Sequence, residues 1–297
     1  MRHRGPDGDG VWAAPGVALA HLRLSIIDVE GSPQPMHDGP GELTITYNGE
    51  IYNYQALRHE LMALGHGFQT SGDTEVILAA YRQWGPACLD RFDGMFAFAI
   101  HDARDGSLFL ARDRFGVKPL HYVRLPDGTI AFASELKGLL TIPQLRVMAE
   151  LTAVEDFLAF GYVPDDNCIV AGVAKLPAGH FLHIRRDRAV PAPQRWWDLD
   201  FTRRITASAA EAEEHLVALM RAAVRSRMVA DVPLGAFLSG GVDSSSVVAL
   251  MAEASATAVE TCSIGFDDAA LDETQHAELI ARRFATSHAQ RIVASDD

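Results

Sequence analysis

Residues 238–246, which read LSGGVDSSS, hold the residue types from which proteins build phosphate sites. Gly240 and Gly241 let the backbone turn tightly and approach a ligand closely. A helix is expected to begin just after them, and the free N–H groups at the start of a helix favour an anion. Ser239, Ser244 and Ser245 offer hydroxyl donors. The segment therefore predicts a cradle for phosphate groups.

The acidic side chain of Asp243 lies within this segment, where it would repel a bare phosphate. Its presence is explained if a magnesium ion lies between the carboxylate and the phosphate oxygens, because Mg²⁺ prefers oxygen ligands. The G-x-x-x-x-G-K-[ST] loop of kinases is absent. A plain strand-to-helix turn with a serine cap would use some of the same residues, but the order of strand, two glycines, aspartate and serines favours the phosphate site.

The elements around this loop predict a parallel sheet. In chain order they are a helix opened by a capping box of Ser208 and Glu211 and ending near Met228, a buried strand over 232–238, a helix from about Ser244, a buried strand over 260–266 and a helix over 273–285. Alternating strands and helices indicate a doubly wound α/β sheet. Only about two units are present, whereas such sheets usually have about five strands, so we expect an incomplete sheet.

The first half of the chain has a different pattern of apolar and polar residues, which predicts an α+β domain rich in antiparallel strands. The expected elements are a half-buried strand over 42–53, a helix over 71–85 that stops at Gly85, and two hairpins over 95–113 and 120–134 that turn at Asp105-Gly106 and at Asp127-Gly128. Prolines and aromatic residues then mark a linker. We expect a first domain over 1–189, a linker over 190–207 and a second domain over 208–297.

Composition narrows the class of protein. The chain has 297 residues and a formal net charge of −13, which argues against general nucleic-acid binding. No apolar run approaches the roughly 18 residues of a membrane span, and no signal-peptide pattern is present. The three cysteines, Cys88, Cys168 and Cys262, are too widely spaced for a disulfide framework or a zinc site. We therefore expect a cytoplasmic protein with neither nucleic-acid nor membrane partners, in which His3 and His21 are structural.

Read in order, the motifs of the chain resemble the glutamine-hydrolysing asparagine synthetases. In the first half they are HRGPDGDG, HLRLSIID, QPM, YNGEIYNY, SGDTEVIL, GMFAFAIHD, LARDRFGVKPL and FASELK, and DVPLGAFLSGGVDSS follows them. The resemblance implies a class II glutamine amidotransferase domain with the αββα sandwich of N-terminal-nucleophile hydrolases. It also implies that the phosphate loop is the pyrophosphate loop of an ATP pyrophosphatase domain.

The resemblance also implies a glutamine site. Arg23 and the residues after it, Leu24, Ser25, Ile26 and Ile27, would bind the α-carboxylate, and Asp73 would take the α-ammonium group. Asn48 and Gly49 would form an oxyanion hole, and Glu50 would complete the contact. Without the resemblance, YNGE would be an ordinary turn and Asp73 a helix N-cap, and both interpretations are compatible with a binding role.

In the second domain, the resemblance implies an ATP site with Mg²⁺ held through Asp243. Leu238 and Ile264 would contact adenosine, and the pyrophosphate would be wrapped by Ser239, Gly240, Gly241, Val242, Asp243, Ser244 and Ser245. The implied reaction is ATP-dependent amidation of aspartate through β-aspartyl-AMP, with ammonia from glutamine. The expected partners are thus glutamine, aspartate and ATP, and a homodimer is left open.

The family's nucleophile is a cysteine that directly follows the initiator methionine, and here that position holds Arg2. We therefore expect that the first strands of the glutaminase domain and the aspartate-binding part of the synthetase domain are missing, and that the chain is an inactive fragment. Two alternatives stay open. The acceptor could differ from aspartate, as in β-lactam synthetases and other amidotransferases, or the chain could be a non-catalytic module that binds glutamine or ATP.

Overall fold

The computed structural model describes residues 2–186, 188–202, 204–268 and 272–294. The chain divides into two units, Met1–Phe201 and Thr202–Asp297, and this division falls within the segment 190–207. The two hairpins predicted from the sequence both lie in the first unit and are confirmed, since β5 pairs with β6 and β7 with β8, both in antiparallel fashion. These hairpins are the centres of two stacked sheets.

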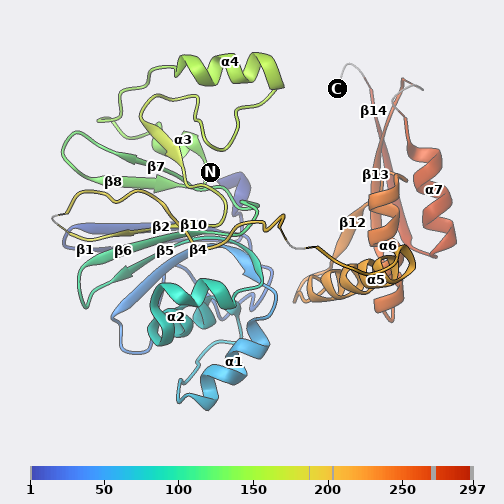
Figure 1. Ribbon diagram of the computed structural model, residues 1–297, viewed down its shortest axis with the longest axis horizontal. Coiled ribbons are helices and arrows are strands. Elements are labelled where there is room, and N and C mark those ends of the chain that lie inside the picture. The colour runs from blue at the N-terminus through green and yellow to red at the C-terminus, as the bar shows by residue number, and fades with distance from the viewer. Residues whose placement is uncertain (1, 187, 203, 269–271, 295–297) are drawn as a thin grey trace. The chain divides into compact units, whose positions relative to one another are not determined.

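The larger sheet of the first unit has six antiparallel strands in the order β11-β10-β6-β5-β4-β3. Their bounds are β3 Met36–His37, β4 Leu43–Ile51, β5 Gly94–Asp102, β6 Ser107–Arg112, β10 His180–Ile184 and β11 Gln194–Arg195. One face is covered by α1 (Tyr54–Ala63) and α2 (Asp73–Trp84), as Figure 1 shows. The helix predicted over 71–85 is therefore confirmed, including its end at Gly85, which takes a positive φ of 58°.

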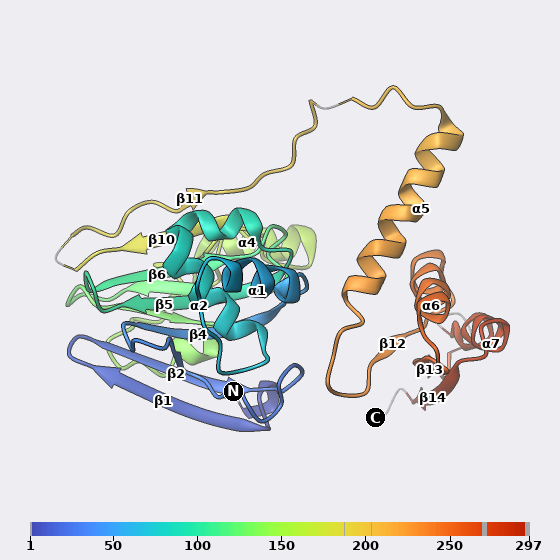
Figure 2. The same cartoon turned by 90° about the horizontal axis from the view of Figure 1, so that it is seen from below.

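The second layer consists of a hairpin and a three-stranded sheet. The hairpin joins β1 (Gly8–Ala14) to β2 (Val17–Arg23), and Figure 2 shows its two strands side by side. The sheet has the order β8-β7-β9, with β7 at His121–Arg124, β8 at Ile130–Ala133 and β9 at Val173–Lys175. The remaining helices are η1 (Arg2–Arg4), η2 (Gly85–Arg91), α3 (Leu136–Leu139) and α4 (Leu151–Phe160).

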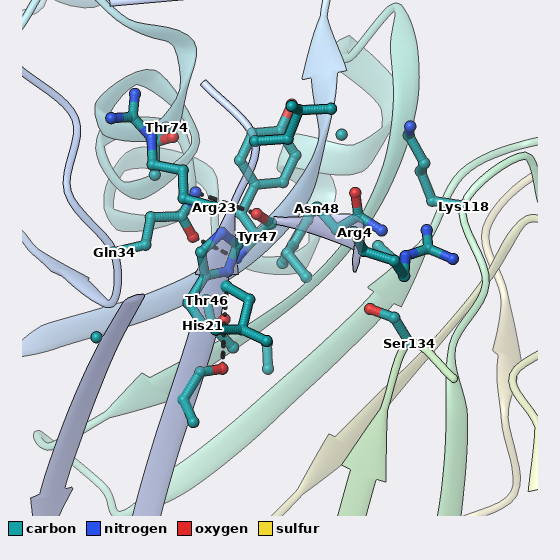
Figure 3. Close-up of a pocket in the computed structure, with 18 of the residues that line it drawn as sticks. Arg4, His21, Arg23, Gln34, Thr46, Tyr47, Asn48, Thr74, Lys118 and Ser134 are labelled. Carbon is teal, nitrogen blue, oxygen red and sulfur yellow. Dashed lines mark hydrogen bonds between the residues drawn. The ribbon is translucent and has the colours of Figure 1, made fainter. Parts of the chain in front are cut away.

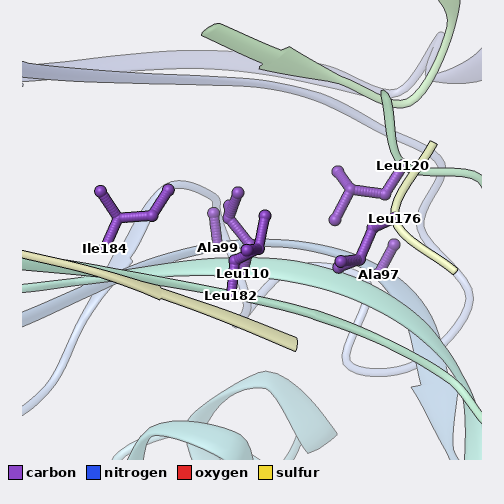
Figure 4. Packing of buried hydrophobic residues seen from close by; sticks show 7 residues of the cluster. All are labelled: Ala97, Ala99, Leu110, Leu120, Leu176, Leu182 and Ile184. Atoms are coloured by element: carbon purple, nitrogen blue, oxygen red, sulfur yellow. The ribbon is translucent and has the colours of Figure 1, made fainter. Parts of the chain in front are cut away.

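One cluster of the core lies between the two layers of strands. Figure 4 shows the side chains of Leu110, Leu182 and Ile184 from the larger sheet, together with Leu120 and Leu176. All of these side chains are buried. A second cluster, which includes Val123, Leu139 and Val173, lies between the three-stranded sheet and α3. The unit thus has helices outside two layers of strands, and the predicted α+β class is confirmed.

The strand over 42–53 was predicted to be half-buried, and this prediction is wrong. In β4 only Thr46, Asn48 and Gly49 are partly exposed, and its other residues are buried. The polar positions of the alternation are Thr44, Thr46, Asn48 and Glu50, and two of these, Thr44 and Glu50, lie inside the unit. β4 is buried on both faces because α2 packs on one side and β2 on the other.

The second unit has a parallel sheet of three strands in the order β12-β13-β14, which confirms the predicted parallel pairing. The strands are β12 Gly235–Phe237, β13 Glu260–Phe266 and β14 Ser287–Val293, and the helices are α5 Ala209–Ser226, α6 Val242–Ala254 and α7 Thr274–Arg283. The predicted capping box of Ser208 and Glu211 opens α5. The ion pair Arg221–Glu253 (2.6 Å) then links α5 to α6.

The two strands of this sheet that were predicted to be buried have one exposed face, so that prediction is wrong in part. Phe237 of β12 is 78% exposed, and Ile264 and Phe266 of β13 are 55% and 44% exposed. The apolar cluster around Leu238 and Val248 includes residues of α7 but only one side of the strands. Within the described parts of the chain, helices therefore cover a single face of this sheet. No helix in those parts has the length and apolar character needed to cross a membrane.

Candidate functional site

A cavity of about 490 Å³ opens in the first unit between β2, β4 and the start of α2. Eight of the nine residues predicted to bind glutamine line it, namely Arg23, Leu24, Ile26, Ile27, Asn48, Gly49, Glu50 and Asp73. The ninth, Ser25, is not part of the lining, and its backbone N–H donates to Asp7 Oδ2 (2.9 Å) instead. Residues separated by up to 50 positions in the sequence are thus brought around one cavity.

The outer edge of β4 supplies the backbone groups of the site. Alternate residues of a strand direct their N–H and C=O groups to the same edge. The N–H of Tyr47 donates to Gln34 Oε1 (2.6 Å), and the N–H of Ile51 donates to Asp73 Oδ2 (2.9 Å). Gly49 lies between these two residues, so its N–H points to the same edge, where the cavity lies.

The pairing of β4 with β5 supports this direction for Gly49. Gly49 lies opposite Phe96 in the ladder. Phe96 directs its own N–H to Asp113 Oδ2 (3.2 Å), and its carbonyl accepts the N–H of Asp113 (2.8 Å). The Gly49–Phe96 pair is therefore one without mutual hydrogen bonds. A Cβ atom added at Gly49 would lie 2.2 Å from the carbonyl oxygen of Met95, so only glycine fits this close approach.

Asp73 is the first residue of α2, after the N-cap Gly72, so the interpretation of Asp73 as a helix N-cap is wrong. Its carboxylate is buried, with 6% of the residue exposed, and Oδ2 accepts hydrogen bonds from the Tyr47 hydroxyl (2.7 Å) and the Ile51 N–H. Burial raises its pKa, and these hydrogen bonds oppose the rise. Among the described residues, no cation pairs with this carboxylate.

Arg23 ends β2 and folds its guanidinium group onto the loop that follows. Nη1 donates to the carbonyl of Val29 (2.6 Å), and Nη2 donates to those of Asp28 (2.7 Å) and Ile27 (3.3 Å). A guanidinium group carries five N–H donors, so these three bonds leave donors for a ligand. Arg23 thus shapes the loop in addition to lining the cavity.

Figure 3 shows that the cavity has two ends. Arg23 and Thr74 lie at one end, Arg4, Lys118 and Ser134 at the other, and Asn48 between them. Burial lowers the pKa of Lys118, and the positive charge of Arg4 lowers it further.

The two histidines that the sequence assigned to structural roles have hydrogen-bond partners that fit them. His21 Nδ1 lies 3.2 Å from Thr46 Oγ1, and burial, aided by the Arg23 charge, lowers the pKa of His21 to about 4. Its ring is therefore neutral at pH 7. His3 Nε2 lies 3.1 Å from Glu135 Oε1. The described residues contain no group of three or more His, Cys, Asp and Glu residues that could hold a metal ion.

None of the three cysteines lines the cavity. Cys88 and Cys168 are buried elsewhere in the first unit, and Cys262 belongs to β13 of the second unit. Burial also raises the pKa of the Cys88 thiol, which disfavours the nucleophilic thiolate.

In the second unit, the predicted phosphate loop joins β12 to α6. Gly241 is the N-cap of α6, so Val242 and Asp243 lie in its first turn, and Asp243 is exposed. Gly240 has a φ of 84°, and a Cβ atom there would lie 2.5 Å from Cβ of His276 on α7.

Two hydroxyl groups of this loop bond to each other, and a third lacks a partner. Ser239 Oγ and Ser244 Oγ are 3.0 Å apart, and Ser244 Oγ also donates to the carbonyl of Gly241 (3.3 Å). Ser245 Oγ is buried without a hydrogen-bond partner among the described residues. Leu238 is buried beneath the loop, and Ile264 lies two residues before the end of β13 with its side chain exposed. A phosphate group fits this turn, because it carries the backbone N–H groups of a helix start together with the hydroxyls of Ser239 and Ser244.

Two family models match the chain. The model of the glutamine amidotransferase domain matches residues 1–197, and that of asparagine synthase matches residues 215–297. The chain belongs to the glutamine-hydrolysing asparagine synthetase family. The family resemblance inferred from the motifs is thereby confirmed.

Curated members of the family show how much of such a protein this chain represents. Asparagine synthetase (glutamine-hydrolyzing) 1 of Bacillus subtilis is 36% identical over 99% of this chain and 46% of its own length. Asparagine synthetase B of Escherichia coli is 36% identical over 88% of this chain and 41% of its own length. The chain thus spans about half the length of the curated relatives it matches.

A solved structure, the glutamine phosphoribosylpyrophosphate amidotransferase of B. subtilis complexed with ADP and GMP, is similar with a TM-score of 0.44 and 17% identity. That similarity covers 94% of this chain and 77% of the other.

Two residues at this cavity were missed by sequence reasoning. Tyr47 donates its hydroxyl hydrogen to Asp73, and Gln34 binds both the N–H and the C=O of Tyr47 through its side-chain amide. Both residues lie in quoted motifs, QPM and YNGEIYNY, but nothing local indicates these contacts.

Proposed function

We propose that the first unit binds L-glutamine in the cavity and that the whole protein uses the amide nitrogen of glutamine to convert aspartate to asparagine with ATP. The observation that carries the proposal is the Asp73 carboxylate, which is buried, hydrogen-bonded on one oxygen by Tyr47 and Ile51, and without a cation among the described residues. A buried carboxylate of this kind is costly unless a positive group pairs with it. The α-ammonium group of glutamine is such a partner.

The other cavity residues suit the rest of the glutamine molecule. Arg23 has donors left for the α-carboxylate. Asn48 and Gly49 line the same cavity, and the side-chain amide of Asn48 and the N–H of Gly49 would face the side-chain amide of glutamine. When a nucleophile attacks that amide carbon, its oxygen becomes negative, and two fixed donors stabilise the charge. This is the chemistry of an oxyanion hole.

For the second unit we propose ATP binding at residues 238–245 and Ile264. The N–H groups at the start of α6 and the hydroxyl of Ser245, which lacks a partner, would hold phosphate oxygens. Asp243 would hold Mg²⁺, which neutralises phosphate charge when bound. Aspartate must be activated because a carboxylate oxygen is a poor leaving group, whereas AMP is a good one. We further propose that the first unit has the αββα sandwich of N-terminal-nucleophile hydrolases and that the protein is cytoplasmic.

We also propose that this chain binds glutamine without hydrolysing it. Its three thiols lie away from the cavity, so none is placed to attack the ligand. Activity would then require a nucleophile that these residues do not supply. Purified chain incubated with glutamine should release no glutamate above background. Release that a thiol-alkylating glutamine analogue abolishes would contradict this proposal.

Isothermal titration of the purified chain tests the binding proposal directly. We expect L-glutamine to bind saturably at one site per chain, and ATP to bind at one site when Mg²⁺ is present. The variant Ser25→Ala serves as a control and should bind glutamine as the unaltered chain does, because Ser25 belongs to the same motif but not to the cavity lining. Absence of saturable glutamine binding by the folded chain would refute the proposed function of the first unit.

A further inference from the structure

The loop of residues 27–31 lies between Arg23 and Asp73, the two residues proposed to bind the charged groups of glutamine. On one side, the guanidinium group of Arg23 donates to three successive carbonyl groups of this loop, those of residues 27, 28 and 29. On the other side, the loop contacts the residues that directly precede Asp73. The same short segment therefore contacts Arg23 itself and the residues next to Asp73.

The side chain of Asp28 makes the second of these connections. Its Oδ2 accepts hydrogen bonds from the backbone N–H groups of Ser71 (3.0 Å) and Gly72 (3.2 Å). The same oxygen accepts the hydroxyl of Ser32 (2.8 Å), and Oδ1 accepts the N–H of Gly31 (3.2 Å). Asp28 thus ties its own loop to the start of α2. These hydrogen bonds lower the pKa of its carboxyl group, although partial burial opposes them.

Packing at this junction is tight. A Cβ atom on Gly72 would lie 2.5 Å from Ser32 Oγ and 3.2 Å from Cβ of Asp28. A Cβ atom on Gly31 would lie 2.4 Å from Asp28 Oδ1. The loop and the helix start therefore pack in close contact, and neither glycine leaves room for a larger residue.

The backbone of Asp28 is also unusual. Its φ is 50°, in the left-handed region that few residues other than glycine adopt. Such a conformation persists where the surrounding contacts over-determine it, and it is concentrated at ligand sites. Here the contacts include the hydrogen bonds to its carboxylate from Gly31, Ser32, Ser71 and Gly72 and the bond from Arg23 to its carbonyl.

We propose that Asp28 is a positioning residue that fixes the distance between Arg23 and Asp73, and thereby sets the selectivity of the cavity for the head group of an α-amino acid. Asp28 does not line the cavity and so acts only through the two residues that do. An α-amino acid presents its carboxylate and ammonium groups at one fixed separation. Partners held rigidly at matching positions bind both groups at once, which is the advantage of preorganisation. This inference rests on the proposed glutamine site.

The test compares L-glutamine with the analogue that lacks the α-amino group, by isothermal titration of the full chain. Asp28→Asn removes the charge that accepts the N–H groups of Ser71 and Gly72, while asparagine tolerates the left-handed backbone. We expect the Kd of L-glutamine to rise about tenfold, the effect of one charge-assisted hydrogen bond. The Kd of the analogue, which cannot use Asp73 in either protein, should change less, so the ratio of the analogue's Kd to that of L-glutamine should fall.

A matched control and a milder variant complete the test. The control is Asp127→Asn. Asp127 also accepts a backbone N–H in a turn, that of Thr129 (2.9 Å), but it lies outside the cavity. This change should leave both Kd values unchanged. Ser32→Ala removes one hydrogen bond to Asp28 and keeps the charge, so we expect a smaller rise for L-glutamine. If Asp28→Asn does not fold, Ser32→Ala alone tests the role of Asp28.

The outcomes separate the inference from the function on which it depends. An unchanged ratio of the two Kd values in folded Asp28→Asn, or in Ser32→Ala if Asp28→Asn is unfolded, would overturn the role of Asp28 and leave the glutamine site intact. A lower melting temperature with an unchanged ratio would mean that Asp28 only stabilises the fold, and so would also overturn it. If the unaltered chain does not bind L-glutamine, the glutamine site itself is refuted, and this inference falls with it.

Discussion

Replacing Asp73 with asparagine should weaken glutamine binding while the fold persists. Asparagine keeps an oxygen that can accept the hydrogen bonds of the Tyr47 hydroxyl (2.7 Å) and the Ile51 N–H (2.9 Å). What is lost is the negative charge that would face the α-ammonium group. A hydrogen bond to a charged group is worth about 1.5–3 kcal/mol. Since 1.36 kcal/mol is a factor of ten, the Kd of L-glutamine should rise by about one to two powers of ten.

Isothermal titration of the unaltered and Asp73→Asn chains measures this change. Glu75→Gln is the matched control, because Glu75 lies on the same helix, accepts hydrogen bonds from Gln69 and Thr70, and is absent from the cavity lining. It should leave the Kd unchanged. A second ligand sharpens the result. Glutamine that lacks its α-amino group cannot use the charge of Asp73, so Asp73→Asn should not weaken its binding.

The result that would refute this reasoning is an equal loss of affinity for both ligands in Asp73→Asn. It would mean that Asp73 supports the shape of the cavity without contacting the ammonium group. In an active asparagine synthetase with the same cavity, the corresponding comparison is between nitrogen sources. Glutamine-dependent synthesis should fall with the affinity, whereas ammonia-dependent synthesis should persist, because free ammonia does not need the glutamine cavity.

Three further predictions concern the same two units. Burial raises the pKa of Asp73 above its ordinary value of 3.8, so titrations at decreasing pH should show glutamine affinity falling as this carboxylate is protonated. Because the folded-state pKa is raised, the free energy of unfolding should decrease as pH rises from 3.8 through the folded value, and Asp73→Asn should lack this dependence. Gly49→Ala should lower the free energy of unfolding in urea by about 1–3 kcal/mol, because its Cβ would lie 2.2 Å from the carbonyl oxygen of Met95. Gly39→Ala is the control and should have little effect, because there is open space around Gly39. Equal stabilities of the two variants would contradict the close approach. Asp243→Asn should abolish the Mg²⁺-dependent part of ATP binding in titrations with and without the metal, and unchanged Mg²⁺ dependence would exclude the proposed metal contact.

The parts of the fold that the sequence predicted are those set by neighbours in the chain. The turn at Asp105-Gly106, the helix over 73–84 and the capping box of Ser208 and Glu211 all depend on residues within a few positions of one another. β14 was not predicted, because its sequence, SHAQRIV, is largely polar and its pairing is supplied by β13.

Burial was harder to predict than the presence of an element. An apolar run such as residues 260–266 indicates a strand but not how many of its faces other elements cover, and the exposed side of β13 follows from packing distant in sequence. The same limit applies to β4, whose alternating pattern does not reveal that α2 and β2 cover both of its faces.

The candidate site divides in the same way. The motifs indicated Asn48, Gly49 and Asp73, which the cavity brings together. The contacts that hold them, from Tyr47 to Asp73 and from Asp28 to the start of α2, join residues 26 and more than 40 positions apart. No periodicity or spacing in a single sequence encodes such a contact, because it depends on how the layers stack.

The outer edge of β4 has a consequence for solubility. A strand edge with a row of open N–H and C=O groups is a template on which another chain can add a strand, and aggregates grow from such edges. Here the amide of Gln34 occupies the position at Tyr47, and the carboxylate of Asp73 occupies the one at Ile51. Only the position at Gly49 is left open between them. A single open position is too short to seed a new strand, so the side chains that would admit a small molecule also protect this edge from self-association.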